Sequence, residues 1–239
     1  MGRIKRYRTA LSRHHRSKGH GIHSPFAFNF VRFVLREKSP YYCYEDMDLL
    51  RQVVVHSLKG VKNHSRVISM KDLKMIFRIA NFFNQPSIFQ VGSCYGLTAA
   101  SVFNVSQASR MWLYDPHIGD YPVAAQVLAP YIDRVECYNE LEVAVDDYND
   151  ALNDGDCPFI IVNSVPRSME LDPLKRLLGS MLSRECIIVI RNIDRSDSVK
   201  TLWRFLKAEM THGQSFTNEK TAVIVSKKKL NSEHFFLWF

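Results

Sequence analysis

The sequence predicts an α/β fold: a mostly parallel sheet with helices on both faces, preceded by an all-helical segment. From residue 87 onward, five short apolar runs alternate with helical stretches. The runs are apolar on both faces, as strands of a sheet covered by helices must be. They occupy 87–91, 110–114, 134–138, 158–162 and 186–190. The helical stretches that follow them are 97–107, 123–131, 141–152, 169–182 and 198–210.

The chain ends differently from this alternation. Residues 215–227 (SFTNEKTAVIVSK) have the pattern of an antiparallel hairpin, with polar residues between two strand-like runs. A last apolar segment, 234–239 (HFFLWF), has no helix after it. The sheet is therefore predicted to close with a hairpin.

The first 85 residues predict a helical extension. Ser24 is a good N-cap and Pro25 fits the first helical position. The residues that follow place apolar side chains at helical spacing, and two further helices are predicted over 45–57 and 72–83. The first apolar face comprises Phe26, Phe30, Phe33 and Val34. We expect residues 1–85 to form a basic helical extension and 86–239 the sheet domain.

Positive charge is concentrated in this extension. The net charge of the chain is +8, and residues 1–38 hold ten Lys or Arg and one acid, Glu37, so the remainder carries −1. Such an arm could bind nucleic acid or an anionic membrane, or it could be a solvated start of the chain. We favour the solvated start. The first helix has more phenylalanine than one apolar face needs. These rings could pack onto the sheet domain, form a lid over a pocket or form a homodimer contact, and we favour packing.

Composition sets the expected compartment. The chain has 239 residues, of which 46% are apolar, enough for one large core. No apolar run approaches the length of about 18 residues that a membrane helix needs, and no apolar segment follows the charged N-terminus as in a secretory signal. The five cysteines form no C-x-x-C pair and predict reduced thiols. We therefore expect a cytoplasmic protein without membrane insertion.

Ligands of an open α/β sheet bind at the carboxyl ends of its strands. This rule predicts the candidate site from position alone. The candidate segments are 90–96, 115–116, 139–140, 163–164 and 191–192.

The first two of these segments fit a nucleoside site. Gly92 and Gly96 follow the first strand and allow close approach to a helix N-terminus, although tight turns use glycine for packing too. Asp115 ends the second strand about 20 residues later, where a carboxylate can accept both hydroxyls of a ribose. Tyr95 and Tyr121 could line the pocket, although aromatic residues at such positions as often serve only in packing.

The chain resembles a known family at this point. QVGSCYGLTAA (residues 90–100) is similar to the E-(I/L)-G-T-x-x-G-x-(S/T) motif of class I S-adenosylmethionine-dependent methyltransferases, in particular their O-methyltransferase-like branch. HGIHSPF (20–26) and EHFFLWF (233–239) resemble the two ends of a bacterial group of predicted methyltransferases. The resemblance covers nearly the whole chain. It implies a Rossmann-like sheet of about seven strands with an antiparallel C-terminal hairpin.

The resemblance also implies roles in binding S-adenosylmethionine. The loop would lie along the methionine and ribose, Asp115 would hold the ribose, and the residues after the third strand would border the adenine. The implied cofactor-binding residues are Gln90, Gly92, Ser93, Tyr95, Gly96, Asp115, Asn139, Glu140 and Asn163.

Three positions depart from the family pattern. Gln90 replaces the acid that helps to hold the cofactor's ammonium group, and Asn163 and Arg191 replace acids that bind a divalent cation in the metal-dependent branch. Mg²⁺ and Ca²⁺ need several hard anionic oxygens as ligands, and Asp194 supplies only one carboxylate. We therefore expect no metal.

Three functions remain open from the sequence. The first is a metal-independent methyltransferase acting on a small molecule, for which methyl transfer needs placement more than a base. No catalytic residue is assigned. His117, just past Asp115, is a possible base, but we favour an ordinary loop histidine. The second is a degenerate member that binds a nucleoside cofactor or a protein partner without turnover. The third, disfavoured, is a nucleic-acid enzyme using the basic arm.

Overall fold

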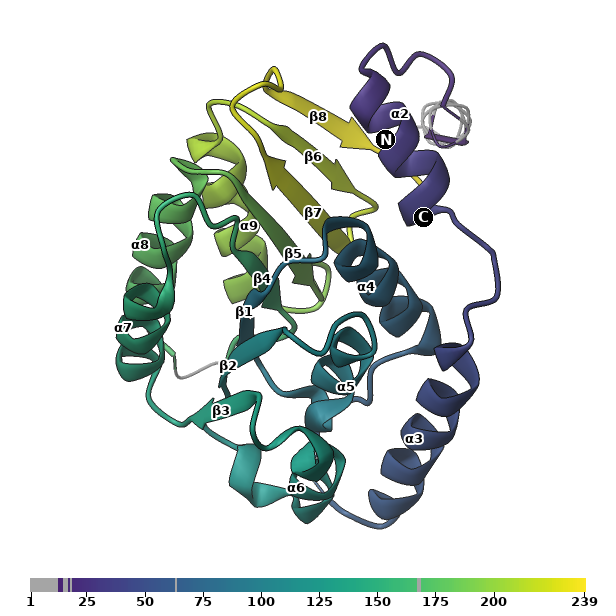
Figure 1. Cartoon of the computed structure of the whole chain (residues 1–239), viewed down its shortest axis with the longest axis vertical. Coiled ribbons are helices and arrows are strands. Elements are labelled where there is room, and N and C mark those ends of the chain that lie inside the picture. The colour runs from purple at the N-terminus through teal and green to yellow at the C-terminus, as the bar shows by residue number, and fades with distance from the viewer. Residues whose placement is uncertain (1–12, 15–16, 18, 63, 167–168) are drawn as a thin grey trace.

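The computed structural model describes residues 13–14, 17, 19–62, 64–166 and 169–239. Its centre is an eight-stranded sheet of order β3-β2-β1-β4-β5-β7-β6-β8 (Figure 1). Five parallel strands form one part of this sheet, and β7 pairs antiparallel with both β5 and β6. The predicted α/β class is confirmed.

The parallel strands coincide closely with the predicted runs. They are β1 (Ser87–Val91), β2 (Arg110–Tyr114), β3 (Val135–Tyr138), β4 (Phe159–Val162) and β5 (Cys186–Arg191). Alternate residues on one strand face opposite sides, so Ile88 and Phe89 enter different hydrophobic clusters. Both side chains are fully buried. The uniformly apolar strands are thus explained by a helical layer on each face.

Each face of the sheet carries its own set of helices. One layer is formed by α4 (Met70–Phe83), α5 (Leu97–Phe103) and α6 (Pro122–Leu128), with α3 (Cys43–Ser57) packed outside α4 and α5. The opposite layer is formed by α7 (Leu141–Ala151), α8 (Leu171–Leu182) and α9 (Asp197–Glu209). In Figure 1 these two layers lie on opposite sides of the strands.

The N-terminal extension packs onto the sheet domain. The helix α2 (Pro25–Phe30) has the predicted Ser24 cap and continues as a π-helical turn, η1 (Val31–Leu35). Phe30 is fully buried against Phe216 of β6, with ring centroids 4.9 Å apart. Arg78 of α4 donates hydrogen bonds to the carbonyls of Val34 (2.7 Å) and Leu35 (3.2 Å) at the end of η1. These carbonyls lack helical partners, so Arg78 completes the end of this helix.

Several N-terminal expectations stay predictions. Residues 1–12, 15–16 and 18 of the predicted basic arm lie outside the described residues. The division of the chain at residue 85, a nucleic-acid partner and a homodimer are likewise untested. Within the described part of the chain, each helix is too short or too polar to cross a bilayer.

The sheet has one strand more than the seven expected. β6 (Gln214–Thr217) and β7 (Thr221–Ser226) form the predicted hairpin, and β8 (Glu233–Phe236) adds in parallel to β6. The ring of Phe235 stacks on Phe216 at 5.2 Å, and the Arg13 guanidinium lies 3.3 Å from the centre of the Phe236 ring. The last apolar segment is therefore an edge strand that N-terminal residues cover.

Gly213 is required where β6 begins. Its φ is +88°, and a Cβ there would meet the carbonyl oxygen of Val225 and lie 2.8 Å from the Cα of Ser226. Gly60 has a similar φ of +81°, but a Cβ at that position would meet no atom within 4 Å. Substitutions at these two glycines share the cost of a left-handed backbone, but only the one at Gly213 adds a steric collision.

We predict that Gly213→Ala destabilises the fold far more than Gly60→Ala. The left-handed backbone alone should cost about 1 kcal/mol in either variant. Collision with β7 should raise the loss for Gly213→Ala to about 3 kcal/mol. Urea unfolding followed by circular dichroism measures both free energies, and equal losses would contradict the packing described here.

Candidate functional site

A cavity of about 960 Å³ opens at the carboxyl ends of the central strands. The loops after β1, β2, β4 and β5 line it, together with the β6–β7 turn and the segment that precedes α4. This volume suits a ligand of cofactor size. The site predicted from strand order therefore coincides with a cavity.

Protein packing explains the two glycines of the first loop. Gly92 (φ +82°) and Gly96 (φ +78°) both have left-handed backbones. A Cβ on Gly92 would meet the hydroxyl of Ser164 and lie 3.1 Å from its backbone nitrogen, whereas a Cβ on Gly96 would lie 2.9 Å from side-chain atoms of Val127 and Leu128. Neither glycine is by itself a sign of a ligand.

The residues between these glycines are more unusual. Cys94 (φ +48°) and Tyr95 (φ +59°) are consecutive non-glycine residues in the left-handed region. Such residues cost of order 1–3 kcal/mol each and gather at functional sites. The Tyr95 hydroxyl donates to the carbonyl of Ser65 at 2.8 Å, and its ring packs edge-on against Tyr121. These contacts hold the loop against the segment before α4 and against the start of α6.

Asp115 joins the loop after β1 to the loop after β2. One carboxylate oxygen accepts a hydrogen bond from the backbone N–H of Ser93 at 2.7 Å, and the other accepts from the N–H of His117 at 3.0 Å. The residue is half-buried and lines the cavity. Each oxygen keeps a further lone pair, so the carboxylate can still accept two hydroxyl groups.

Gln90 lies beneath the loop and not in the cavity lining. Its side chain is fully buried, and its amide nitrogen donates to the carbonyls of Gly92 (2.9 Å) and Ser93 (3.3 Å). Its amide oxygen has no partner among the described residues. A carboxylate could not donate to these two carbonyls, so glutamine is the residue type that fits this loop.

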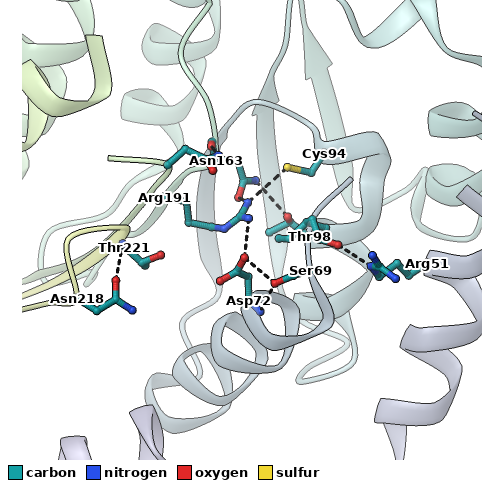
Figure 2. A network of polar contacts seen from close by, with 11 residues as sticks. Arg51, Ser69, Asp72, Cys94, Thr98, Asn163, Arg191, Asn218 and Thr221 are labelled. Carbon is teal, nitrogen blue, oxygen red and sulfur yellow. Dashed lines mark hydrogen bonds and ion pairs between the residues drawn. The ribbon is translucent and has the colours of Figure 1, made fainter. Parts of the chain in front are cut away.

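Arg191 is the centre of a polar cluster beside the loop (Figure 2). Its guanidinium donates to the amide oxygen of Asn163 at 3.0 Å, to Asp72 at 3.1 Å and to the sulfur of Cys94 at 3.7 Å. The Asn163 amide donates in turn to the Gly92 carbonyl (3.0 Å). Only 6% of the Arg191 side chain is exposed. The cation therefore lies buried where strands β4 and β5 end.

Burial also keeps the neighbouring thiol neutral. It raises the pKa of Cys94 above the ordinary value of a cysteine, and the nearby Arg191 guanidinium lowers it by less. The thiol therefore stays protonated at neutral pH and serves the cluster as a weak, uncharged acceptor.

Asp72 is a site residue that the sequence did not indicate. It lies in the first turn of α4, where the Ser69 hydroxyl caps the Asp72 N–H (3.2 Å) and donates to the Asp72 carboxylate (2.8 Å). This S-x-x-D pattern resembles a capping box and predicts a helix start. Nothing local in the sequence indicates that the carboxylate also pairs with Arg191, 119 residues away.

The nine cofactor-binding residues predicted from the sequence divide into two groups. Gly92, Ser93, Tyr95, Asp115 and Asn163 line the cavity together. Outside its lining lie Gln90, Gly96, Asn139 and Glu140. Asn139 and Glu140 are exposed at the end of β3, so a role at the adenine stays a prediction.

His117 and its partner Asp120 also line the cavity. His117 pairs with Asp120 at 3.0 Å, and both side chains are more than half exposed. Within the described ranges, no group of three or more His, Cys, Asp or Glu side chains is arranged to hold a metal.

Comparisons with known proteins identify the fold. Neither a family model nor a curated protein matches the sequence. Solved structures do match in fold.

The O-methyltransferase TomG of Streptomyces achromogenes, in complex with S-adenosylmethionine (SAM), aligns with a TM-score of 0.51 at 13% identity, over 82% of this chain and 95% of that one. The Bacillus cereus O-methyltransferase in complex with S-adenosylhomocysteine (SAH) aligns with a TM-score of 0.51 at 12% identity, over 81% of this chain and 95% of that one. The SAH-bound methyltransferase PaMTH1 of Podospora anserina aligns with a TM-score of 0.54 at 12% identity, over 87% of this chain and 97% of that one. The fold is therefore that of Rossmann-like methyltransferases.

We predict strong energetic coupling between Arg191 and Asp72. Arg191→Met should lower the free energy of unfolding by about 2 kcal/mol, because it leaves polar partners unsatisfied. Combining it with Asp72→Asn should cost at least about 1 kcal/mol less than the sum of the two single losses. Urea unfolding of the wild type, single and double variants gives this coupling.

The exposed pair Asp172–Lys175, 3.0 Å apart, is the matched control. Solvent screening should keep its coupling below about 0.5 kcal/mol. If the Arg191–Asp72 coupling is no larger than this, the cluster does not hold the site together.

Proposed function

We propose that this protein is a SAM-dependent methyltransferase that acts without a metal on a small-molecule acceptor. The observation that carries the proposal is the bond between the Asp115 carboxylate and the Ser93 N–H at the wall of the cavity. This bond brings together the loop and the acid whose spacing in the sequence predicted a nucleoside site. The methyltransferase fold and the SAM or SAH bound to its structural neighbours support the same reading.

The residues present fit this cofactor. Asp115 would hold the ribose hydroxyls through its remaining lone pairs, and the Gly92–Tyr95 backbone would border the methionine part. The buried Gln90 oxygen, which has no partner among the described residues, is an uncharged acceptor beneath the same loop. When bound, SAM supplies an electrophilic methyl group.

The chain's contribution to the reaction would be placement. In-line displacement on a methyl group gains most from holding two reactants in one geometry, and a general base is needed only for a weakly nucleophilic acceptor. The Arg191 cluster fixes the floor between β4 and β5, and Tyr95 joins the loop to the segment before α4. Both contacts keep the cavity in one shape.

We predict that the protein binds SAH and that Asp115→Ala weakens this binding at least about tenfold, since a hydrogen bond to a charged group contributes about 1.5–3 kcal/mol. Isothermal titration calorimetry measures the affinity. Asp115→Asn retains one acceptor oxygen, so its SAH affinity should lie between those of the wild type and Asp115→Ala. Asp150→Ala, on the exposed face of α7, is the matched control and should bind like the wild type.

Two outcomes would contradict this account of the cofactor. Wild-type protein that does not bind SAH at about 1 mM has lost the cofactor site. Unchanged binding in a folded Asp115→Ala variant removes the ribose assignment. Tight SAH binding without methyl transfer to any acceptor would favour the degenerate alternative.

We predict that divalent cations leave this binding unchanged. The guanidinium of Arg191 repels a cation at the position between β4 and β5, and Asn163 supplies only a neutral oxygen there. SAH affinities measured in EDTA and in about 5 mM Mg²⁺ should agree within about twofold. An affinity that rises sharply with Mg²⁺ would show that a metal site exists after all.

A further inference from the structure

The cavity has two halves that the strand order separates. β1 and β2 lie on one side of β4 and carry the Gly92–Tyr95 loop and Asp115. β5 and β7 lie on the other side. The loops next to them line the second half with Arg191, Asn192, Asp194, Arg195, Asn218, Lys220 and Thr221. If the cofactor is bound at Asp115, as proposed above, the second half is left for the methyl acceptor.

Two basic side chains belong to this second half. Arg195 follows β5 and Lys220 lies in the β6–β7 turn, and both are exposed and line the cavity. The backbone N–H of Ile193 donates to the carbonyl of Lys220 at 3.1 Å, which fixes the two loops to one another. Asn218 steadies the turn by accepting from the N–H groups of Lys220 (3.0 Å) and Thr221 (2.9 Å).

Neither cation is compensated within the described part of the chain. The ion pairs and side-chain hydrogen bonds among these residues include none from the Arg195 guanidinium or the Lys220 ammonium. The nearby acids are mostly engaged elsewhere. Asp72 pairs with Arg191, and Glu219, next to Lys220, pairs with Arg13 at 3.1 Å.

Asp194 is the remaining acid in the lining of this half. Its single negative charge is smaller than the two positive charges of Arg195 and Lys220. The second half therefore presents a net positive potential to the cavity. Arginine matches the paired oxygens of a carboxylate or phosphate, and lysine adds a point charge.

We propose that the methyl acceptor is a small molecule bearing an oxyanion, a carboxylate or a phosphate, and that Arg195 and Lys220 bind this group. The assignment to an acceptor rests on the proposed function. The oxyanion site itself can be measured independently of it.

The test uses three probes on the full chain: inorganic phosphate, 4-hydroxybenzoate and the uncharged 4-hydroxybenzamide. Amide chemical shifts in ¹H–¹⁵N NMR spectra report binding at residues 192–196 and 218–221. At least one of the two anions should give saturable shifts there, and the benzamide should give none. Saturation by phosphate alone indicates a phosphate-bearing acceptor, and saturation by 4-hydroxybenzoate alone indicates a carboxylate.

Variants identify the groups that bind. Arg195→Gln and Lys220→Gln should each weaken anion binding at least about fivefold, and the double variant should abolish it. Lys200→Gln, an exposed lysine of α9 outside the cavity lining, is the matched control and should change nothing. The SAH affinity of the double variant should equal that of the wild type.

Several results would overturn the proposal: no saturable shift with either anion up to about 50 mM, equal binding of the benzamide, or anion binding that persists in the double variant. A lower SAH affinity in the double variant would also overturn it, because the two cations would then serve the cofactor's carboxylate. Failure of the proposed function looks different: the wild type would not bind SAH, while anions would still bind at Arg195 and Lys220.

Discussion

One buried guanidinium determines how the site is built. Arg191, at the end of β5, binds Asn163 at the end of β4, Cys94 in the loop after β1 and Asp72 at the start of α4. A buried charge is costly unless it is paired and hydrogen-bonded, so these elements must meet in one arrangement. Asn163 extends the constraint, since its amide also binds the Gly92 carbonyl. The helical extension, the loop and two central strands are thereby linked through a single side chain.

This arrangement changes the meaning of the departures from the methyltransferase pattern. The family that the sequence resembles has acids where this chain has Gln90, Asn163 and Arg191, and each difference taken alone would be read as decay of a cofactor and metal site. In the structure they form complementary contacts: Gln90 donates to the carbonyls of the loop, and Arg191 donates to the Asn163 oxygen. An amide can donate where a carboxylate cannot, and a cation can fill the place of another cation. The substitutions are mutually consistent, which favours a rebuilt pocket over a decayed one.

Local signals in the sequence predicted the elements well and the site in part. The apolar runs give β1 and β2 residue for residue, and Ser24 caps the first helix as its pattern indicates, because periodicity and capping are local. Strand order also placed Asp115 and Asn163 at the cavity. Arg195 lies in the loop after β5, beyond the two residues expected there. Asp72 and Lys220 reach the cavity through contacts between distant segments, which no local pattern encodes. The eighth strand was missed for the same reason: β8 forms by pairing with β6, and a four-residue run carries little signal of its own.

In the proposed arrangement, the nucleoside cofactor binds at Asp115, and Arg191 keeps the position between β4 and β5 free of a metal. A crystal structure of the protein grown with SAH and Mg²⁺ tests both parts at once. We expect ribose hydroxyls within hydrogen-bond distance of the Asp115 carboxylate, with Arg191 still bound to Asp72 and Asn163. SAH bound elsewhere, or a cation coordinated between β4 and β5 with Arg191 displaced, would contradict it.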